Sequence, residues 1–502
     1  MSGAREEYGD WQTPYELARD ICLMLKKKGI APTTIVEPAC GRGSFIRAAL
    51  DVFGTVESVY AIEINPSYIE TVRQLAREYT AEFYIYCQSV FDFDFSTVSG
   101  DRILMLGNPP WVTNSRIGAI GGGNLPAKSN FKRQRGIEAL TGKGNFDISE
   151  SIMLSLFSSF AHSGADFAFL LKDSVIRSLV YSDTAAAAGA AFSQYSIDAK
   201  KEFGASASAS LLAGRLGCEA ARRECRVYDF YSGKYSRTFA MVGGVQVSDI
   251  EAYRKSRAVD GTCQFIWRSG IKHDCAKIME LRRGAGGCYT NGLGQSLVIE
   301  SDLVYPLAKS SDLQKACVSA EKFVLIPQRK VSEDTSAIER IYPLTYGYLL
   351  SNSLYFEKRK SVIYRNKPKF CIFGVGDYSF LPYKVAVSSL YRSTAFSLLE
   401  PAGGKPIMVD DTCYSIGFES KSAAALTLRI LNSHVVQAFI KAVSPSDSKR
   451  VITKDILMRI DIAMALQQLT DEELEITPLQ RAEYMHSLRK ATHDVPSLFS
   501  FA

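Results

Sequence analysis

Short β-rich runs alternate with helical stretches through the first 180 residues, and this order constrains the fold more than any other feature of the chain. Apolar side chains have helical spacing at residues 15–28, 44–52, 68–79 and 149–161. Strands are expected at residues 33–36, 58–62, 82–87, 103–106 and 167–171. Because such alternation builds a parallel sheet covered on both faces, it predicts an α/β domain with a mostly parallel, twisted sheet.

The length of 502 residues exceeds what one hydrophobic core usually supports, so we expect at least two domains. After about residue 250 the pattern changes to short β-rich segments, with helices near 421–441 and at 467–490. We therefore expect a first domain over residues 1–250. A mixed α+β domain with a C-terminal helical segment should follow over residues 251–502. The Ala- and Ser-rich stretch 182–210 is ambiguous.

The composition argues against a metal centre, a disulfide framework and a membrane span. The 11 cysteines include no C-x-x-C pair, and only 5 histidines are present. We expect reduced thiols and no bound metal. No apolar run reaches the roughly 18–20 residues that cross a bilayer, and the polar start lacks the pattern of a secretory signal. We therefore expect a cytoplasmic protein that does not contact a membrane.

The net charge of +6 is unevenly distributed along the chain. Residues 1–250 sum to −1, residues 251–460 to +11 and residues 461–502 to −4. A basic region of this size favours contact with a polyanion. A basic surface that only maintains solubility is the alternative.

A glycine-containing turn follows the first expected strand, in the sequence VEPACGRGSF (residues 36–45). Gly41 and Gly43 allow a sharp turn and close approach of the backbone to a ligand. Glu63 ends the next strand, where a carboxylate can accept hydrogen bonds from both hydroxyls of a ribose. The pattern lacks the third glycine of the dinucleotide fingerprint and the Lys-Ser/Thr ending of a phosphate loop. By itself it indicates a nucleotide-type ligand.

The most specific motif is GNPPW, residues 107–111, at the end of the fourth expected strand. An exocyclic amino group on a base is a poor nucleophile, because its lone pair is delocalised into the ring. Two acceptors that grip its hydrogens would aim that lone pair outward. Asn108 supplies a side-chain carbonyl, and Pro109 fixes the backbone so that a main-chain carbonyl can be the second acceptor. Trp111 offers a face on which a base can stack.

In the order of these motifs, the chain resembles S-adenosylmethionine-dependent DNA methyltransferases that modify the N6 amino group of adenine. The order is similar to the gamma arrangement of TaqI-like enzymes, in which a cofactor domain precedes a target-recognition domain. The resemblance implies a Rossmann-like class I methyltransferase domain over residues 1–250 and a DNA target-recognition domain over residues 251–502. It also implies S-adenosylmethionine as the cofactor.

The resemblance assigns a role to each matching residue. The positions that match cofactor contacts are Thr13, Glu37, Cys40, Gly41, Gly43, Glu63, Ser89 and Asn108. Those that match the catalytic motif and the second aromatic residue around the base are Asn108, Pro109, Pro110, Trp111 and Phe203. Two residues depart from the family pattern. Ser89 stands where an aspartate usually binds the cofactor adenine, and Trp111 replaces the commoner tyrosine.

The resemblance further implies direct methyl transfer to an adenine flipped out of double-stranded DNA. A long loop at residues 118–135 follows the catalytic motif, and four of its cations are candidates for phosphate contact: Lys128, Lys132, Arg133 and Arg135. The densest basic and aromatic stretch, residues 355–370, adds Lys358, Arg359, Lys360, Arg365 and Lys367. A solvated linker and an exposed charged face are the alternatives. We expect a monomer in a bacterial or archaeal cell. A separate cognate restriction endonuclease is a possible partner.

Other functions fit part of the pattern. The same grip on an amino group suits N4-cytosine methylation, and an N-P-P-aromatic motif also occurs in RNA and protein-glutamine methyltransferases. A binding module with a decayed site is a third alternative. Asp411, Glu419 and Lys421 resemble a nuclease core, although this pattern is common by chance.

Overall fold

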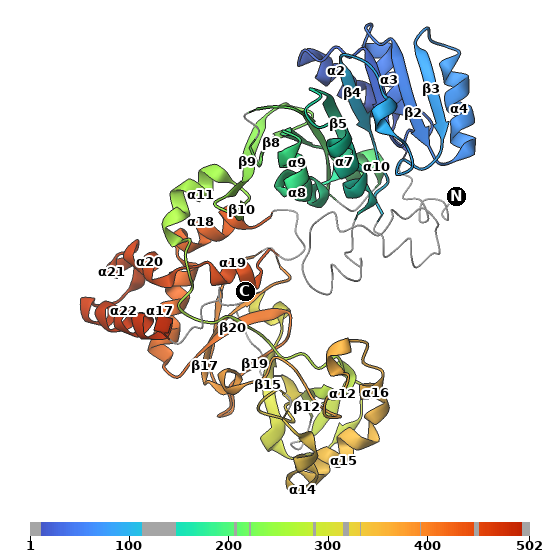
Figure 1. Ribbon diagram of the computed structural model, residues 1–502. Coiled ribbons are helices and arrows are strands. Elements are labelled where there is room, and N and C mark those ends of the chain that lie inside the picture. Colours follow the sequence, from blue (N-terminus) through green and yellow to red (C-terminus); the bar gives the residue numbers. More distant parts are fainter. Residues whose placement is uncertain are drawn as a thin grey trace. The chain divides into compact units, whose positions relative to one another are not determined.

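The computed structural model describes residues 12–112, 147–204, 208–219, 222–284, 288–314, 321–331, 333–391, 393–445 and 451–493 (Figure 1). The chain separates into two compact units, Met1–Glu251 and Ala252–Ala502, with helix α11 (Ile250–Ser256) at the division.

The first unit is built on a ten-stranded sheet with the order β10-β9-β8-β6-β7-β5-β4-β1-β2-β3. Its strands are β1 (Thr34–Glu37), β2 (Ser58–Glu63), β3 (Glu82–Cys87), β4 (Ile103–Gly107), β5 (Asp166–Lys172), β6 (Ala191–Ser196), β7 (Ala209–Arg215), β8 (Glu224–Asp229), β9 (Tyr235–Val242) and β10 (Val245–Val247). Strands β3, β2, β1, β4 and β5 are parallel, whereas β7 is antiparallel to both of its neighbours. This order confirms the expected Rossmann-like α/β domain.

Helices cover both faces of this sheet because successive side chains of a strand point to opposite faces. The helices of the first unit are α2 (Tyr15–Lys27), α3 (Ser44–Val52), α4 (Pro66–Ala76), α7 (Ile148–Ser159), α8 (Asp173–Tyr181), α9 (Asp183–Ala187) and α10 (Ala199–Phe203). On one face, α2 and α3 pack on Ile35, Leu104 and Leu170. On the other face, α7 and α8 pack on Val36 and Met105.

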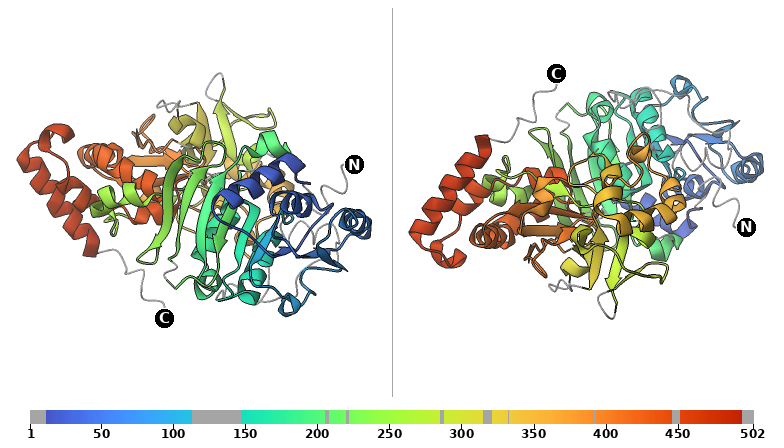
Figure 2. Two further views of the ribbon diagram at one scale, coloured as in Figure 1. Left: turned by 90° about the horizontal axis from the view of Figure 1, so that it is seen from above. Right: turned by 90° about the horizontal axis from the view of Figure 1, so that it is seen from below.

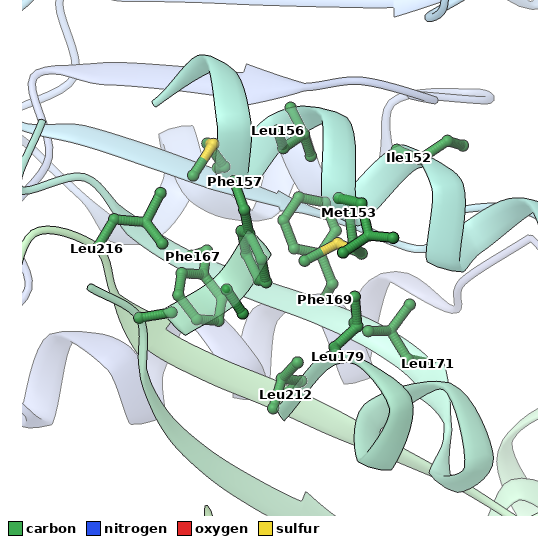
Figure 3. Close-up of a cluster of buried hydrophobic side chains, with 14 of the residues drawn as sticks. Ile152, Met153, Leu156, Phe157, Phe167, Phe169, Leu171, Leu179, Leu212 and Leu216 are labelled. Carbon is green, nitrogen blue, oxygen red and sulfur yellow. The ribbon is translucent and has the colours of Figure 1, made fainter. Parts of the chain in front are cut away.

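Helix α7 packs against β5 in the core near the site. Figure 3 shows Met153 and Phe157 of α7 beside Phe167 and Phe169 of β5. Phe157, Phe167 and Phe169 are fully buried. Burial of a large aromatic side chain contributes about 1.5–3 kcal/mol, so this cluster fixes the position of α7 on the sheet.

The second unit contains two smaller sheets and a group of C-terminal helices. The four-stranded sheet has the order β11-β20-β17-β18, and the six-stranded sheet has the order β14-β13-β12-β16-β15-β19. Their strands are β11 (Arg268–Ser269), β12 (Glu280–Arg283), β13 (Tyr289–Asn291), β14 (Ser296–Leu297), β15 (Val304–Ala308), β16 (Lys322–Leu325), β17 (Tyr383–Ser388), β18 (Ser397–Leu399), β19 (Met408–Val409) and β20 (Cys413–Phe418). This is the mixed α+β architecture expected for the later half of the chain.

The helices of the second unit are α12 (Ala276–Met279), α13 (Ser310–Gln314), α14 (Ile338–Ile341), α15 (Pro343–Ser351), α16 (Ser353–Glu357), α17 (Lys421–Asn432), α18 (His434–Val443), α19 (Lys454–Met458), α20 (Ile462–Gln467), α21 (Asp471–Leu474) and α22 (Pro478–His493). The helices near the C-terminus group together (red in Figure 2), and they include the longest helices of this unit, α17 and α22. No single helix in the described part of the chain is long and apolar enough to cross a membrane. Helices α17 and α18 together have sufficient length and apolar composition, but the chain bends by 56° between them.

One expectation about the elements needs correction, and the structure assigns the stretch that was ambiguous. The helix expected over residues 467–490 is broken, because Glu475 adopts a left-handed conformation (φ 51°) after α21 and Pro478 starts a new helix. The ambiguous stretch 182–210 contains α9, β6, α10 and the start of β7. Strand β6 forms because residues 191–196 pair with β7 on one side and β8 on the other.

Candidate active site

The carboxyl ends of β1, β2 and β4 meet at one edge of the first unit's sheet, and the expected site residues lie there. Glu37 ends β1, Glu63 ends β2, and Asn108 follows β4 directly. All three line one pocket, together with Thr13, Cys40, Gly41, Ser89 and Pro110. Open α/β sheets bind their ligands at this edge.

The turn between β1 and α3 needs both of its glycines. Gly41 and Gly43 have φ values of 52° and 82°, a region that strains other residues. A Cβ atom on Gly41 would also lie 3.0 Å from the side-chain amide of Gln12. The turn is tied to the sheet because the Cys40 amide donates to the Ile62 carbonyl at 3.0 Å. Its backbone is therefore held close against the pocket.

The Glu63 carboxylate organises the neighbouring backbone. Its Oε2 accepts from the Gly41 amide at 2.9 Å, and its Oε1 accepts from the Asn65 amide at 2.8 Å. Asn65 in turn caps α4 by accepting from the Ser67 amide at 3.0 Å. Asn65 was not among the sequence-predicted site residues, although Asn-Pro-Ser at residues 65–67 is a helix-start signal that could have identified it.

The Glu37 carboxyl is almost completely buried, with 2% of its surface exposed. Among the described residues, its Oε2 atom has no hydrogen-bond partner. Burial raises the pKa of Glu37 well above its usual value, the Ile46 backbone amide opposes this rise, and the charge of Glu63 adds to it. A buried carboxyl with one oxygen that has no hydrogen-bond partner among the described residues, at the wall of a pocket, favours a ligand that brings a positive charge.

The Asn108 side chain is oriented by the N-terminal segment. Its Nδ2 donates to the Thr13 hydroxyl at 3.2 Å, and Thr13 is itself buried. With Nδ2 turned towards Thr13, the side-chain carbonyl of Asn108 points the opposite way. The segment just before α2 therefore fixes the amide that the GNPPW motif presents.

Trp111 and Phe203 are brought together, as expected from the resemblance, but in direct contact. Their ring centroids are 5.4 Å apart with an interplanar angle of 70°. Trp111 is buried and its indole Nε1 donates to the Leu170 carbonyl at 3.2 Å. Phe203 is only partly buried, at the end of the short helix α10. Because the edge contact leaves no room for a base between the rings, the Phe203 side chain has to turn before a base can stack there.

Ser89 lies in the pocket wall but does not supply an acidic group. Its hydroxyl accepts from the Phe91 amide at 3.4 Å. Gln88, Val90 and Phe91 line the same part of the pocket. Any recognition of a ligand's base at this end therefore relies on neutral polar groups and apolar contact.

The structure describes only some of the basic residues that were predicted to contact DNA. Lys128, Lys132, Arg133 and Arg135 lie outside the described residues. Lys358, Lys360, Arg365 and Lys367 are exposed on the second unit.

Arg359, another candidate for DNA contact, uses its guanidinium inside the second unit. It donates to the carbonyls of Phe356 at 3.1 Å, Cys371 at 2.7 Å and Lys369 at 3.1 Å. It also lies over the Tyr364 ring, 3.8 Å from the centroid. In this arrangement Arg359 connects two segments of the fold.

The nuclease-like pattern does not come together as one site. Asp411 pairs with Lys272 at 3.2 Å, whereas Lys421 pairs with Glu400 at 2.6 Å. In the described ranges, no group of three or more His, Cys, Asp or Glu side chains is placed to hold a metal ion.

Comparisons with known proteins place the chain in a family. No family model matches it. It is 37% identical over 464 residues to the type II methyltransferase M.NspV of Nostoc sp., covering 91% of this chain and 96% of that protein. Among solved structures, it has a TM-score of 0.48 and 12% identity to the type IIL restriction–modification enzyme MmeI in complex with DNA, over 96% of this chain and 72% of that one. It has a TM-score of 0.33 and 14% identity to a type I restriction–modification methyltransferase subunit of Streptococcus thermophilus, over 44% and 47% of the two chains.

The sequence relative carries the assignment, since it is similar over nearly the whole length of both chains. The chain therefore belongs to the family of type II methyltransferases, the DNA methyltransferases of restriction–modification systems, and its cofactor is S-adenosylmethionine.

Proposed function

We propose that the chain is a site-specific adenine-N6 methyltransferase that acts on an adenine flipped out of double-stranded DNA. One observation carries this proposal. Asn108, whose amide donates to Thr13, lines the cofactor pocket, and Trp111 of the same motif contacts Phe203. An acceptor in the wall of a methyl-donor pocket, followed in the same motif by a residue of an aromatic pair, suits a planar base that carries an amino group.

The pocket residues fit S-adenosylmethionine. When bound, S-adenosylmethionine supplies a methyl carbon on a positively charged sulfur atom. Glu37 offers a buried carboxyl without a hydrogen-bond partner for one of its oxygens among the described residues, which suits a cationic ligand. Glu63 holds the glycine turn and faces the same pocket, where its remaining lone pairs can accept from hydroxyl groups. Val90 and Phe91 add apolar wall at the end where the base would lie.

In this proposal, catalysis depends on position and on hydrogen-bond acceptors rather than on a covalent intermediate. The Asn108 side-chain carbonyl and a main-chain carbonyl of the Pro109–Pro110 segment accept from the two hydrogens of the amino group. This holds its lone pair towards the methyl carbon. Trp111, and Phe203 after it turns, stack on the two faces of the base. The amino proton is released to solvent after transfer.

The second unit is proposed to recognise the DNA target. The charge of +11 over residues 251–460 and the exposed cations Lys358, Lys360 and Arg365 support this role, because cations that neutralise phosphates dominate affinity for DNA. A separate cognate endonuclease and a monomeric state stay predictions of the family resemblance.

Transfer of label from S-adenosylmethionine to unmethylated genomic DNA tests the proposal. The wild-type protein should label DNA, and Asn108→Ala should lose at least a hundredfold in rate. Label in RNA or protein but not in DNA would contradict the proposed substrate. An Asn108→Ala protein of wild-type rate would contradict the proposed role of the amide.

A further inference from the structure

Lys172 connects the catalytic motif to a neighbouring strand of the sheet. It is the last residue of β5, which runs parallel to β4 and lies beside it. Its ammonium group donates to the main-chain carbonyl of Trp111 at 2.9 Å and to the Asp147 carboxylate at 2.6 Å. The two side chains of this ion pair are largely buried, with 21% of Lys172 and 10% of Asp147 exposed.

Asp147 carries this connection to helix α7. Its second oxygen, Oδ1, caps the helix by accepting from the Ser149 amide at 3.2 Å and the Ser149 hydroxyl at 2.6 Å. Next to it, the Ile148 amide donates to the Val112 carbonyl at 2.9 Å. The backbone that leaves the catalytic motif is thus joined to the start of α7 by two independent contacts.

Both parts of the site depend on these contacts. The Trp111 side chain is held from the same strand, through its indole bond to Leu170 of β5. Ile148 and Ile152 of α7 form part of the cofactor pocket. Lys172 therefore fixes the backbone of the proposed base-stacking residue relative to the pocket wall that faces the methyl donor.

We infer that Lys172 and Asp147 form a positioning pair that sets the alignment of the GNPPW motif with the cofactor, an inference that rests on the proposed function. Through its bond to the Trp111 carbonyl, the Lys172 amine acts on the backbone of the motif. Methyl transfer needs in-line placement of donor and acceptor, and a displacement of about 1 Å can cost on the order of a hundredfold in rate.

Single-turnover kinetics test the pair. Lys172→Met should lower the rate of methyl transfer by about 10- to 100-fold and change the affinity for S-adenosylmethionine by less than about threefold. Lys172→Arg, which keeps the charge and the donors, should recover most of the rate. The matched control is Arg215→Met, which breaks the Arg215–Asp166 ion pair (2.8 Å) at the opposite end of the same strand. It should leave the transfer rate within twofold of wild type.

A measurement independent of activity follows the Trp111 ring. The chain has 3 tryptophans, so incorporation of 5-fluorotryptophan gives three fluorine NMR signals, and Trp111→Phe identifies that of Trp111. Lys172→Met should shift or broaden the Trp111 signal alone, and Arg215→Met should not change it.

An unchanged Trp111 signal in Lys172→Met would overturn the inference. A transfer rate within twofold of wild type, or one that falls only in proportion to the folded fraction, would also overturn it. If the wild-type protein methylates no DNA, the proposed function fails, and the fluorine signal still decides whether the pair positions Trp111.

Discussion

The Thr13–Asn108 contact is the smallest feature on which the proposed chemistry depends. A side-chain amide can turn by 180° about its last bond, and only one of the two orientations presents the carbonyl to a substrate amino group. In this structure the Thr13 hydroxyl accepts from Asn108 Nδ2, which corresponds to that orientation. Thr13, a residue outside the catalytic motif, should therefore have a measurable effect on the rate.

Thr13→Val should lower kcat by about 3- to 10-fold, as expected for the loss of one hydrogen bond of 0.5–1.5 kcal/mol. Thr13→Ser retains the hydroxyl and is the matched control, with a kcat within twofold of wild type. Steady-state kinetics at saturating cofactor and DNA make the comparison. Equal rates for the Val and Ser variants would show that the hydroxyl does not orient Asn108.

We expect Glu37 to make the affinity for the cofactor depend on pH. Burial raises the pKa of its carboxyl, so in the empty pocket the carboxyl keeps its proton to a higher pH than an ordinary glutamate. A cationic ligand favours the ionised form. Affinity for S-adenosylmethionine should therefore weaken as the pH falls through the raised pKa of Glu37.

Above the raised pKa of Glu37, Glu37→Gln should bind the cofactor at least tenfold more weakly than the wild type, and it should lose most of this pH dependence. Calorimetric titration at a series of pH values checks both effects. The charge of Glu63 acts on the same site and is present in both proteins, which isolates the contribution of Glu37. A pH profile shared by the variant and the wild type would assign the dependence to another group.

At the scale of elements, the sequence predicts the first unit well because apolar periodicity and motif positions agree there. Glu37, Glu63 and Asn108 each follow a β-rich run, and parallel strands bring such residues to one edge. The Lys172–Asp147 pair could not be predicted, since it depends on β5 lying beside β4. The edge contact of Phe203 with Trp111 depends likewise on the tertiary placement of α10.

Strand β17 contains a lysine whose burial should destabilise the second unit. Lys384 is 2% exposed and its ammonium group donates to the Leu381 carbonyl at 2.9 Å. Desolvation lowers the pKa of Lys384 to about 7. Between that pH and the usual pKa of 10.5 the unfolded chain binds more protons than the folded chain, so stability rises with pH across this interval.

Lys384→Met should raise the stability of the second unit at pH 7 by on the order of a few kcal/mol and flatten this rise. Hydrogen exchange of peptides from β17 and β20 reports on this unit within the full chain. Lys421→Met, at an exposed ion pair, is the control and should have little effect. Faster exchange in Lys384→Met would mean that the lysine contributes more than its burial costs.

At the scale of the whole molecule, the uneven charge of the chain predicts how its affinity for DNA responds to salt. Replacement of Lys358, Lys360 and Arg365 by alanine should weaken binding and reduce the slope of log K against log salt by up to about 3, since each phosphate contact contributes about 0.9. The control replaces three exposed cations of the first unit, Lys27, Arg77 and Lys234. Fluorescence anisotropy over a series of salt concentrations measures the affinity and the salt slope of both variants.

The same measurement of DNA binding over a salt series distinguishes the role of Arg359 from that of the neighbouring cations. Because its guanidinium joins Phe356, Cys371 and Lys369, Arg359→Ala should destabilise the second unit. The salt slope of the protein that stays folded should change little. An unchanged slope in the triple variant would remove residues 358–365 from the proposed DNA surface.

The central claim is that the methyl group goes to N6 of adenine, and the identity of the methylated nucleoside tests it most directly. The wild-type protein is incubated with labelled S-adenosylmethionine and unmethylated genomic DNA, and the DNA is digested to nucleosides and separated. The account predicts label in N6-methyladenine, and its loss in the Asn108→Ala variant. Label in N4-methylcytosine would keep the fold, the cofactor and the grip on an amino group, and would contradict the assignment of the base.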